Sequence, residues 1–161
     1  MEENSPFIFS RAEIRQKGGL TSAFKPDITL FADSLEKPAK IQNLELALEF
    51  FPDEKGPIIL SGSLEAELRL ECSRCGEPLT ARFKENFDEV YEDTVECIDV
   101  RETVRETLVV LAPMKVLCSD ACKGLCPVCG VNRNIKICSC QPPKRNSFAA
   151  LDNFNKENTA R

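Results

Sequence analysis

The chain has 161 residues, with 21 Lys and Arg against 26 Asp and Glu, a formal net charge of −5, nine Cys and no His. This length predicts one domain with room for a small appended module, and the 42% hydrophobic content is enough for a core. Collagen-like and wholly disordered chains are excluded, and no apolar run approaches the ~18 residues of a membrane-spanning helix. Residues 1–6 lack the basic and apolar regions of a signal peptide, so we expect a cytoplasmic protein with reduced thiols.

The absence of His narrows the chemistry of the chain. It excludes mixed Cys–His metal sites and histidine acid–base catalysis. The sequence also has no Gly-x-Ser-x-Gly motif, no P-loop and no dinucleotide fingerprint. We therefore expect neither an enzyme nor a small-molecule substrate, and we expect the cysteines to hold metal.

The two parts of the chain carry opposite net charge, negative in residues 1–114 and positive in residues 115–161. Residues 1–114 carry 13 basic and 23 acidic side chains, whereas residues 115–161 carry 8 basic and 3 acidic ones. We predict an acidic β-rich body over residues 1–114 and a Cys-rich zinc-binding module over residues 115–142. A basic linker and a short terminal helix are predicted for residues 143–161.

The N-terminal part predicts one short helix. Ser10 and Glu13 have the spacing of a capping box, and Gly18-Gly19 provides a stop, so we expect a helix over residues 11–17. Residues 20–40 contain two prolines and little periodicity. They predict a loop with one strand near residues 28–31.

Strict alternation of apolar and polar residues begins at residue 41. It predicts a strand around residues 44–50, a turn at 52–57, a long strand from residue 58 to Cys72 and a returning strand over 79–87. One polar face on all three indicates an antiparallel β-meander, or a partly open barrel.

The rest of the body is acidic and then helical. Residues 85–96 predict a solvated edge, with no calcium-binding pattern. A helix is expected over residues 100–112, because apolar residues recur at helical spacing and Pro113 ends the run. Together these elements predict an α+β fold with a few short helices. Phe148, Leu151 and Phe154 predict a terminal helix that either docks on a partner or folds back on the core.

Two Cys-x-x-Cys-Gly units carry the metal prediction. They are Cys72-Ser-Arg-Cys75-Gly76 and Cys126-Pro-Val-Cys129-Gly130. In a zinc knuckle two thiolates bind one ion from a tight turn, and Gly after the second Cys permits the positive φ that such a turn needs. The full set of expected ligands is Cys72, Cys75, Cys118, Cys122, Cys126, Cys129, Cys138 and Cys140.

The spacing leaves the pairing of these ligands open. In one arrangement two Zn²⁺ ions are held, one by Cys126, Cys129, Cys138 and Cys140, and one by Cys72, Cys75, Cys118 and Cys122. In another, one C-terminal ion is bound and the first Cys pair is free or redox-active. Iron–sulfur ligation is a third arrangement that spacing permits.

Cys97 and the Cys126–Cys129 unit each permit a role other than metal binding. Cys97 stands alone, and we expect a partly buried small side chain rather than a ligand. The Cys126–Cys129 unit is similar to a thiol-redox site, but such a site needs a helix after its first Cys. The following Gly130–Asn134 is a turn sequence.

The order of these motifs resembles a known family. Cys72-Ser-Arg-Cys75 closes a strand, and an acidic strand region and then Ala112-Pro-Met-Lys-Val-Leu-Cys118 follow it. Cys122–Asn132 with Cys138-Ser-Cys140 completes the set. This combination is similar to the YceD family of bacterial proteins, the large ribosomal RNA subunit accumulation proteins, over roughly residues 41–154. Two segments depart from the family pattern: Lys144–Phe148 replaces an Asp-Pro-Arg segment, and the N-terminal 40 residues match loosely.

The resemblance implies a non-enzymatic factor in large-subunit ribosomal RNA accumulation and ribosome biogenesis. Its partners would be a large-subunit ribosomal RNA precursor, a basic large-subunit ribosomal protein, or both, with no membrane. Basic side chains available for phosphates are Lys115, Lys123, Arg133, Lys136, Lys144 and Arg145. Each Zn(Cys)₄ carries a charge of about −2, so two sites would cancel most of this positive charge. A route through a basic ribosomal protein fits the charge better than direct RNA contact. The alternatives are a zinc-stapled adaptor unrelated to ribosomes and a thiol oxidoreductase.

Overall fold

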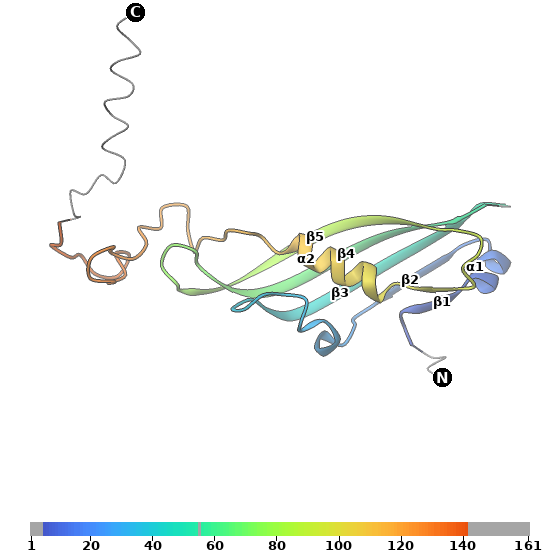
Figure 1. Cartoon of the computed structure of the whole chain (residues 1–161), viewed down its shortest axis with the longest axis horizontal. Coiled ribbons are helices and arrows are strands. Elements are labelled where there is room, and N and C mark those ends of the chain that lie inside the picture. The colour runs from blue at the N-terminus through green and yellow to red at the C-terminus, as the bar shows by residue number, and fades with distance from the viewer. Residues whose placement is uncertain (1–4, 55, 142–161) are drawn as a thin grey trace, which may run out of the picture.

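The computed structural model describes residues 5–54 and 56–141. Its body is a four-stranded antiparallel sheet in the order β2-β3-β4-β5 (Figure 1). The strands are β2 (Leu20–Phe24), β3 (Lys40–Pro52), β4 (Ile58–Glu71) and β5 (Pro78–Tyr91). The predicted meander is therefore confirmed, and the sheets are not closed into a barrel.

One face of the sheet carries the core because its strands alternate in polarity. Along β3 and β4 the leucines point inward, while the intervening Glu and Ser side chains reach solvent. The largest fully buried side chains are Phe7, Phe31, Phe50, Ile14, Leu44, Leu46, Leu48, Ile58, Leu60, Leu64, Leu68 and Ile98. The core thus lies on a single side of a half-buried sheet.

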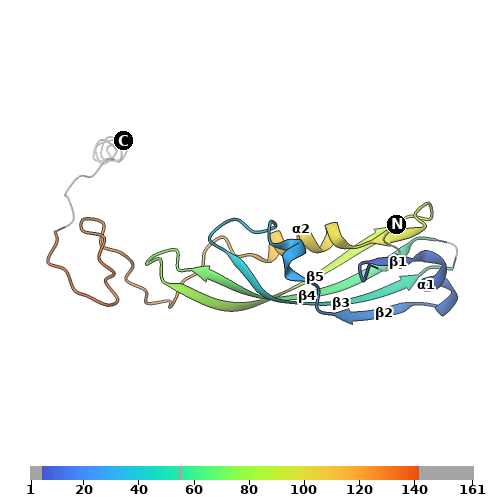
Figure 2. The same ribbon diagram turned by 90° about the horizontal axis from the view of Figure 1, so that it is seen from below.

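Short elements cover this core. Strands β1 (Ile8–Ser10) and β6 (Cys97–Asp99) form a separate antiparallel pair. Helix α2 (Arg101–Leu111) contacts β4 and β5 and lies along one side of the sheet (Figure 2). It buries Val104, Leu108 and Leu111, which are the helical repeat expected from the sequence. The α+β class is confirmed by this arrangement.

Helix α1 (Arg11–Lys17) has the predicted bounds, but its cap differs. Ser10 occupies the N-cap position without a side-chain hydrogen bond, so the predicted capping box does not form. The C-terminal stop is confirmed: Gly18 has φ 68°, and its N–H donates to the carbonyl of Arg15. Val100 occupies the N-cap position of α2, also without a side-chain hydrogen bond, and Asp99 accepts a hydrogen bond from the N–H of Arg101.

The prediction for residues 20–40 was wrong in two places. Residues 20–24 form strand β2 rather than loop, and residues 28–31 form a 3₁₀ helix, η1 (Ile28–Phe31), rather than a strand. Asp27 explains the second difference, because its side chain accepts hydrogen bonds from the N–H and hydroxyl of Thr29. Phe31 is then buried in the core. In the acidic segment predicted as a solvated edge, residues 85–96, β5 continues to Tyr91, and β6 begins directly after the segment at Cys97.

The Cys-rich segment leaves the body at one end of the sheet, beside the β4–β5 turn (Figure 1). Its described part, residues 115–141, contains turns and one isolated bridge between Leu125 and Asn132. The terminal helix predicted around Phe148, Leu151 and Phe154 lies outside the described residues. So does the whole of the predicted linker and terminal segment at residues 143–161.

Candidate metal centres

The structure brings the eight predicted cysteines together in two groups of four. The first cysteine group consists of Cys72, Cys75, Cys118 and Cys122, and the second consists of Cys126, Cys129, Cys138 and Cys140. Within each group the four sulfur atoms lie within 4.8 Å of one another. Of the pairings that the spacing left open, the two-group arrangement is the one observed.

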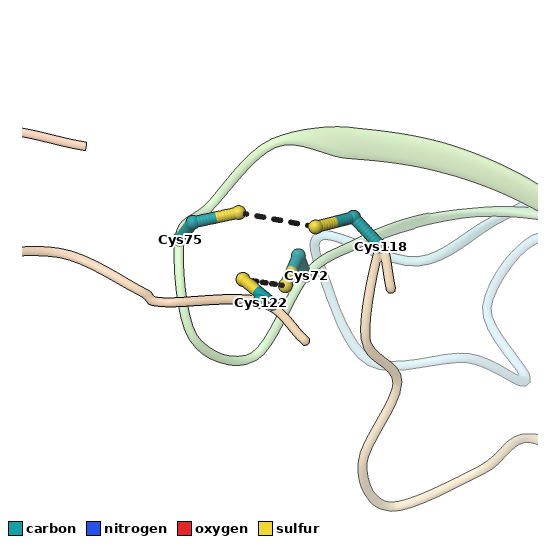
Figure 3. A group of neighbouring side chains, drawn as sticks. All are labelled: Cys72, Cys75, Cys118 and Cys122. Atoms are coloured by element: carbon teal, nitrogen blue, oxygen red, sulfur yellow. Dashed lines mark hydrogen bonds between the residues drawn. The ribbon is translucent and has the colours of Figure 1, made fainter. Parts of the chain in front are cut away.

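The first cysteine group joins the sheet to the Cys-rich segment (Figure 3). Cys72 and Cys75 lie in the turn between β4 and β5, whereas Cys118 and Cys122 follow α2 in the chain. The Sγ atoms of Cys72 and Cys122 are 3.8 Å apart, and those of Cys75 and Cys118 are 3.6 Å apart. Cys72, Cys75 and Cys122 are buried, so three of the four sulfurs are shielded from solvent.

Both Cys-x-x-Cys-Gly units adopt the same backbone turn. The N–H of Gly76 donates to the carbonyl of Cys72, and the N–H of Gly130 donates to that of Cys126, each at 2.9 Å. Both glycines have φ 72°, which confirms the need for Gly after the second Cys. In each unit the N–H of the first Cys also donates, at 2.8 Å, to a carbonyl five residues later. The two units are thus equivalent knuckles.

Backbone contacts hold the first group in register with the sheet. The N–H of Ser73 donates to the carbonyl of Val116 at 2.8 Å, and the N–H of Val116 donates to Ser73 Oγ at 3.2 Å. Arg74 Nη1 donates to the carbonyl of Cys122, and the carbonyl of Arg74 accepts from the N–H of Leu125. These contacts hold the β4–β5 turn against the two segments that contribute Cys118 and Cys122 to the group.

Hydrogen bonds divide the thiols of the first group into two classes. A backbone hydrogen bond from Cys118, opposed by desolvation, lowers the pKa of Cys72 to about 6. A hydrogen bond from the Asn134 amide is the main cause that lowers the pKa of Cys122. By contrast, hydrogen bonds to Cys122 and then to Cys75 raise the pKa of Cys118 to about 12.

The second group repeats this division. Backbone hydrogen bonds from Cys129 and Val128 lower the pKa of Cys126 to about 6, and Val128 N lies 3.5 Å from its sulfur. The hydrogen bond to Cys129 raises the pKa of Cys140 to about 12. In each group the first cysteine of the Cys-x-x-Cys unit, Cys72 or Cys126, has a lowered pKa and ionises readily. Another thiol of the group, Cys118 or Cys140, has a raised pKa and stays protonated.

These donor sets fit a structural metal ion. Four cysteine sulfurs are the ligands of closed tetrahedral zinc sites, in which no coordination position remains for a substrate. Knuckle N–H groups aimed at sulfur offset part of the thiolate charge. Soft thiolates also suit iron–sulfur chemistry, so the donor set by itself identifies a metal site rather than the metal.

Cys97 lies outside both groups. It begins β6, opposite Ser10 in β1, and its side chain is exposed. The expected partial burial was wrong because its strand position points away from the core, which is filled by the neighbouring Ile98. Cys126 is followed by turns within the described part of the Cys-rich segment, whereas a thiol-redox site requires a helix there.

Sequence reasoning missed two residues of the site. Arg74 supports the carbonyl of Cys122, and Asn134 donates from Nδ2 to Cys122 Sγ at 3.2 Å. Neither carries a metal-ligand signature, because an Arg and an Asn in a turn are ordinary surface residues in a sequence. The one available signal for Asn134 was its place in a short loop between two cysteine pairs.

The fold and its cysteine groups define the class of protein: an α+β body with two candidate all-thiolate metal centres. The family model described as large ribosomal RNA subunit accumulation protein YceD matches residues 92–155. This match confirms the resemblance to the YceD family over β6, α2 and the Cys-rich segment. It includes six of the eight clustered cysteines, and Cys72 and Cys75 precede it. No curated protein and no solved structure matches the chain.

Among the residues that the structure describes, none of the helices is long and apolar enough to span a membrane. Strand β4 carries three glutamates at alternate or near-alternate positions, Glu65, Glu67 and Glu71. They lie on the solvent face of the sheet, where Lys84 pairs with Glu65 and Arg82 with Glu67. They are thus solvated side chains of an exposed sheet face.

Proposed function

We propose that this chain is a non-enzymatic factor for large-subunit ribosomal RNA accumulation, and that its two cysteine groups hold structural Zn²⁺. The observation that carries the proposal is the YceD family match over residues 92–155, within which the Cys-rich segment lies. The name of that family links it to accumulation of large-subunit ribosomal RNA. The two groups of four cysteines support the second part of the proposal, the binding of structural Zn²⁺.

Metal ions in these groups would stabilise the folded Cys-rich segment and would not take part in catalysis. The segment 115–141 has little regular structure, and Cys122 and Cys126 are its buried residues besides Gly124. A segment with so little apolar burial gains its folding free energy from metal when metal is bound. All eight cysteines would then serve as ligands, with Cys72 and Cys75 fixing the segment to the sheet.

Charge favours a basic protein as the direct partner. Within the described Cys-rich segment, the basic side chains are Lys115, Lys123, Arg133 and Lys136, against one acidic side chain, Asp120. Two Zn(Cys)₄ sites at about −2 each would offset this excess. The exposed face and edge of the sheet are rich in Glu and Asp, which suits a basic large-subunit ribosomal protein. Ribosomal RNA would be reached through that protein.

The experiment that tests the function measures ribosomal RNA in cells that lack the gene. The cells are complemented with the wild-type chain, with Cys126→Ser or with Cys97→Ser. The ratio of large-subunit to small-subunit ribosomal RNA is then measured. We expect the ratio to fall in the deletion strain, to recover with wild type and Cys97→Ser, and to stay low with Cys126→Ser.

Each part of the proposal has its own contrary result. An unchanged ratio in the deletion strain contradicts the role in ribosomal RNA accumulation and favours an adaptor unrelated to ribosomes. Full rescue by Cys126→Ser contradicts the need for the second cysteine group. A defect with Cys97→Ser equal to that with Cys126→Ser would indicate general thiol chemistry instead of metal binding.

A further inference from the structure

The two cysteine groups are connected by more than the chain that joins them. The loop 130–137 starts and ends beside ligands of the second group, Cys129 and Cys138. Its middle nevertheless contacts the first group, because Asn134 Nδ2 donates to Cys122 Sγ at 3.2 Å. A loop fixed by one group thus provides a hydrogen bond to a ligand of the other.

The orientation of the Asn134 amide is set by its other contacts. The N–H of Lys123 donates to Asn134 Oδ1 at 2.7 Å, so the carbonyl side of the amide is engaged. The NH₂ group is therefore the one that faces the sulfur, and only this side of an amide can donate. Asn132 Oδ1 accepts from both the backbone N–H and the Nδ2 of Asn134, at 3.0 Å each.

Further contacts tie the loop to the first knuckle. Asn132 Nδ2 donates to Glu77 Oε1 at 3.1 Å, and the carbonyl of Glu77 accepts from the N–H of Cys72. The N–H of Arg133 donates to the carbonyl of Gly124 at 2.9 Å. Residues 132–134 thus contact both the β4–β5 turn, at Glu77, and the segment 122–124.

We propose that Asn134 is a positioning residue that couples the two metal centres, so that metal in the second group strengthens metal binding in the first. Metal held by Cys129 and Cys138 fixes both ends of the loop and places the Asn134 amide on Cys122 Sγ. An N–H···S hydrogen bond supports the charge of a ligating thiolate. Linkage requires the effect to be reciprocal, so metal in the first group strengthens binding in the second. The inference rests on the proposed metal binding by both groups.

The test uses the full-length reduced chain and Cd²⁺ as a thiophilic probe. Cadmium-113 NMR reports each group separately, once the resonances are assigned with Cys75→Ser and Cys129→Ser. Affinity is measured by adding a competing chelator to wild type, Asn134→Asp, Asn134→Ala and Ile135→Ala. Asn134→Asp keeps the acceptor for Lys123 but replaces the donor with a carboxylate oxygen. Ile135 is the matched control, since its side chain lies in the same loop and is 77% exposed.

We expect both Asn134 variants to weaken Cd²⁺ binding in the first group by roughly 10- to 100-fold, with Ile135→Ala unchanged. Cys138→Ser should also weaken the first group in the otherwise wild-type chain. In the Asn134→Ala chain, Cys138→Ser should have a smaller effect on the first group than in the wild-type chain, because the Asn134 contact is already absent.

Two results would overturn the coupling while leaving metal binding intact. One is an unchanged first-group affinity in the Asn134 variants. The other is a double variant whose loss of first-group Cd²⁺ affinity equals the product of the losses caused by Asn134→Ala and Cys138→Ser alone, as expected for independent changes. Failure of wild type to bind any Cd²⁺ would overturn both the coupling and the proposed metal centres. Circular dichroism of the β-sheet checks that each variant keeps its body folded.

Discussion

The cysteines within each group differ in how readily they lose a proton. Cys72 and Cys126 have pKa values lowered to about 6, whereas Cys118 and Cys140 have values raised to about 12. A ligating thiol must be deprotonated, so metal binding releases the protons that the thiols still carry. The number of protons released is therefore a function of pH.

Proton release per metal ion should rise as the pH falls through about 6. At pH 7.5, Cys72 and Cys126 are largely thiolates already, and mainly the thiols with raised pKa give up protons. Below pH 6 the metal must displace protons from Cys72 and Cys126 as well, so affinity falls more steeply there. Calorimetry of Zn²⁺ binding in buffers of different ionisation enthalpy measures this number. Equal release at pH 5.5 and 7.5 would contradict the assignment.

Both the backbone conformation of Gly124 and the space around it disfavour a side chain at this position. Its φ is 69°, and an added Cβ would lie 3.0 Å from the carbonyl oxygen of Arg74. The left-handed conformation alone costs an L-residue about 1–2 kcal/mol. Gly18, with φ 68° and open space around it, is the matched control. We expect Gly124→Ala to weaken first-group metal affinity while Gly18→Ala leaves it unchanged, as measured by chelator competition. Equal metal affinity in both variants would contradict this contact.

Spacing alone predicted the eight clustered cysteines, because thiolate ligands come in recognisable pairs. Their partition into groups needed the structure, since Cys118 and Cys122 could serve either knuckle by distance along the chain. Asn134 could not be found from the sequence. Its role depends on a loop of one group lying against the other, which is a tertiary contact without a local pattern.

At the scale of elements, β4 and β5 pack around a glycine. Gly62 is buried in the middle of β4 and is directly opposite Phe87 of β5. A Cβ on Gly62 would overlap the ring of Phe87, which covers the space that the glycine leaves. Phe87 is one of four partly buried β5 side chains that pack against the core, together with Leu79, Phe83 and Tyr91.

Gly62→Ala should destabilise the body by about 1–3 kcal/mol, because the Phe87 ring must move out of its packed position. Phe87→Leu, which removes the ring, should relieve part of this cost, so the double variant should be more stable than the sum of the single changes predicts. Urea unfolding followed by circular dichroism gives the three free energies. Strict additivity would show that the two residues do not share this space.

Elements with strong periodicity were predictable, and short ones were not. Strands β3 and β4 and helix α2 followed from the repeat of their apolar residues. Strand β2 was missed because Leu20-Thr-Ser-Ala-Phe24 is short and weakly apolar, and it pairs with β3 through its backbone. Residues 28–31 look β-prone, but the Asp27 cap and burial of Phe31 favour a helical turn. Tertiary context outweighed local propensity there.

At the scale of the whole molecule, the body and the Cys-rich segment differ in what stabilises them. The body has a continuous apolar core, whereas the described Cys-rich segment has few buried apolar side chains apart from its cysteines. Removing metal with a chelator should therefore disorder the segment and leave the sheet folded. Hydrogen exchange should show fast amides after residue 117 and protected amides in β3 and β4. Loss of protection throughout the sheet would contradict this division.

Replacement of a single ligand in the body should change the metal content of the whole chain. Cys72→Ser removes a ligand that the sheet contributes to the first group, so we expect one tightly bound Zn²⁺ per chain instead of two. Cys97→Ser, which changes an exposed thiol outside both groups, should keep the wild-type content. Metal analysis after gel filtration gives these values. Unchanged zinc content in Cys72→Ser would exclude a shared site.

The position of the first group has a consequence for the unfolded chain. Its ligands come from the β4–β5 turn and from the segment after α2, so a bound ion cross-links two points more than 40 residues apart and closes β5, β6 and α2 into a ring. A ring that persists during unfolding has lower conformational entropy than an open chain. The ion would then stabilise the sheet without touching its core, by making the unfolded state less favourable.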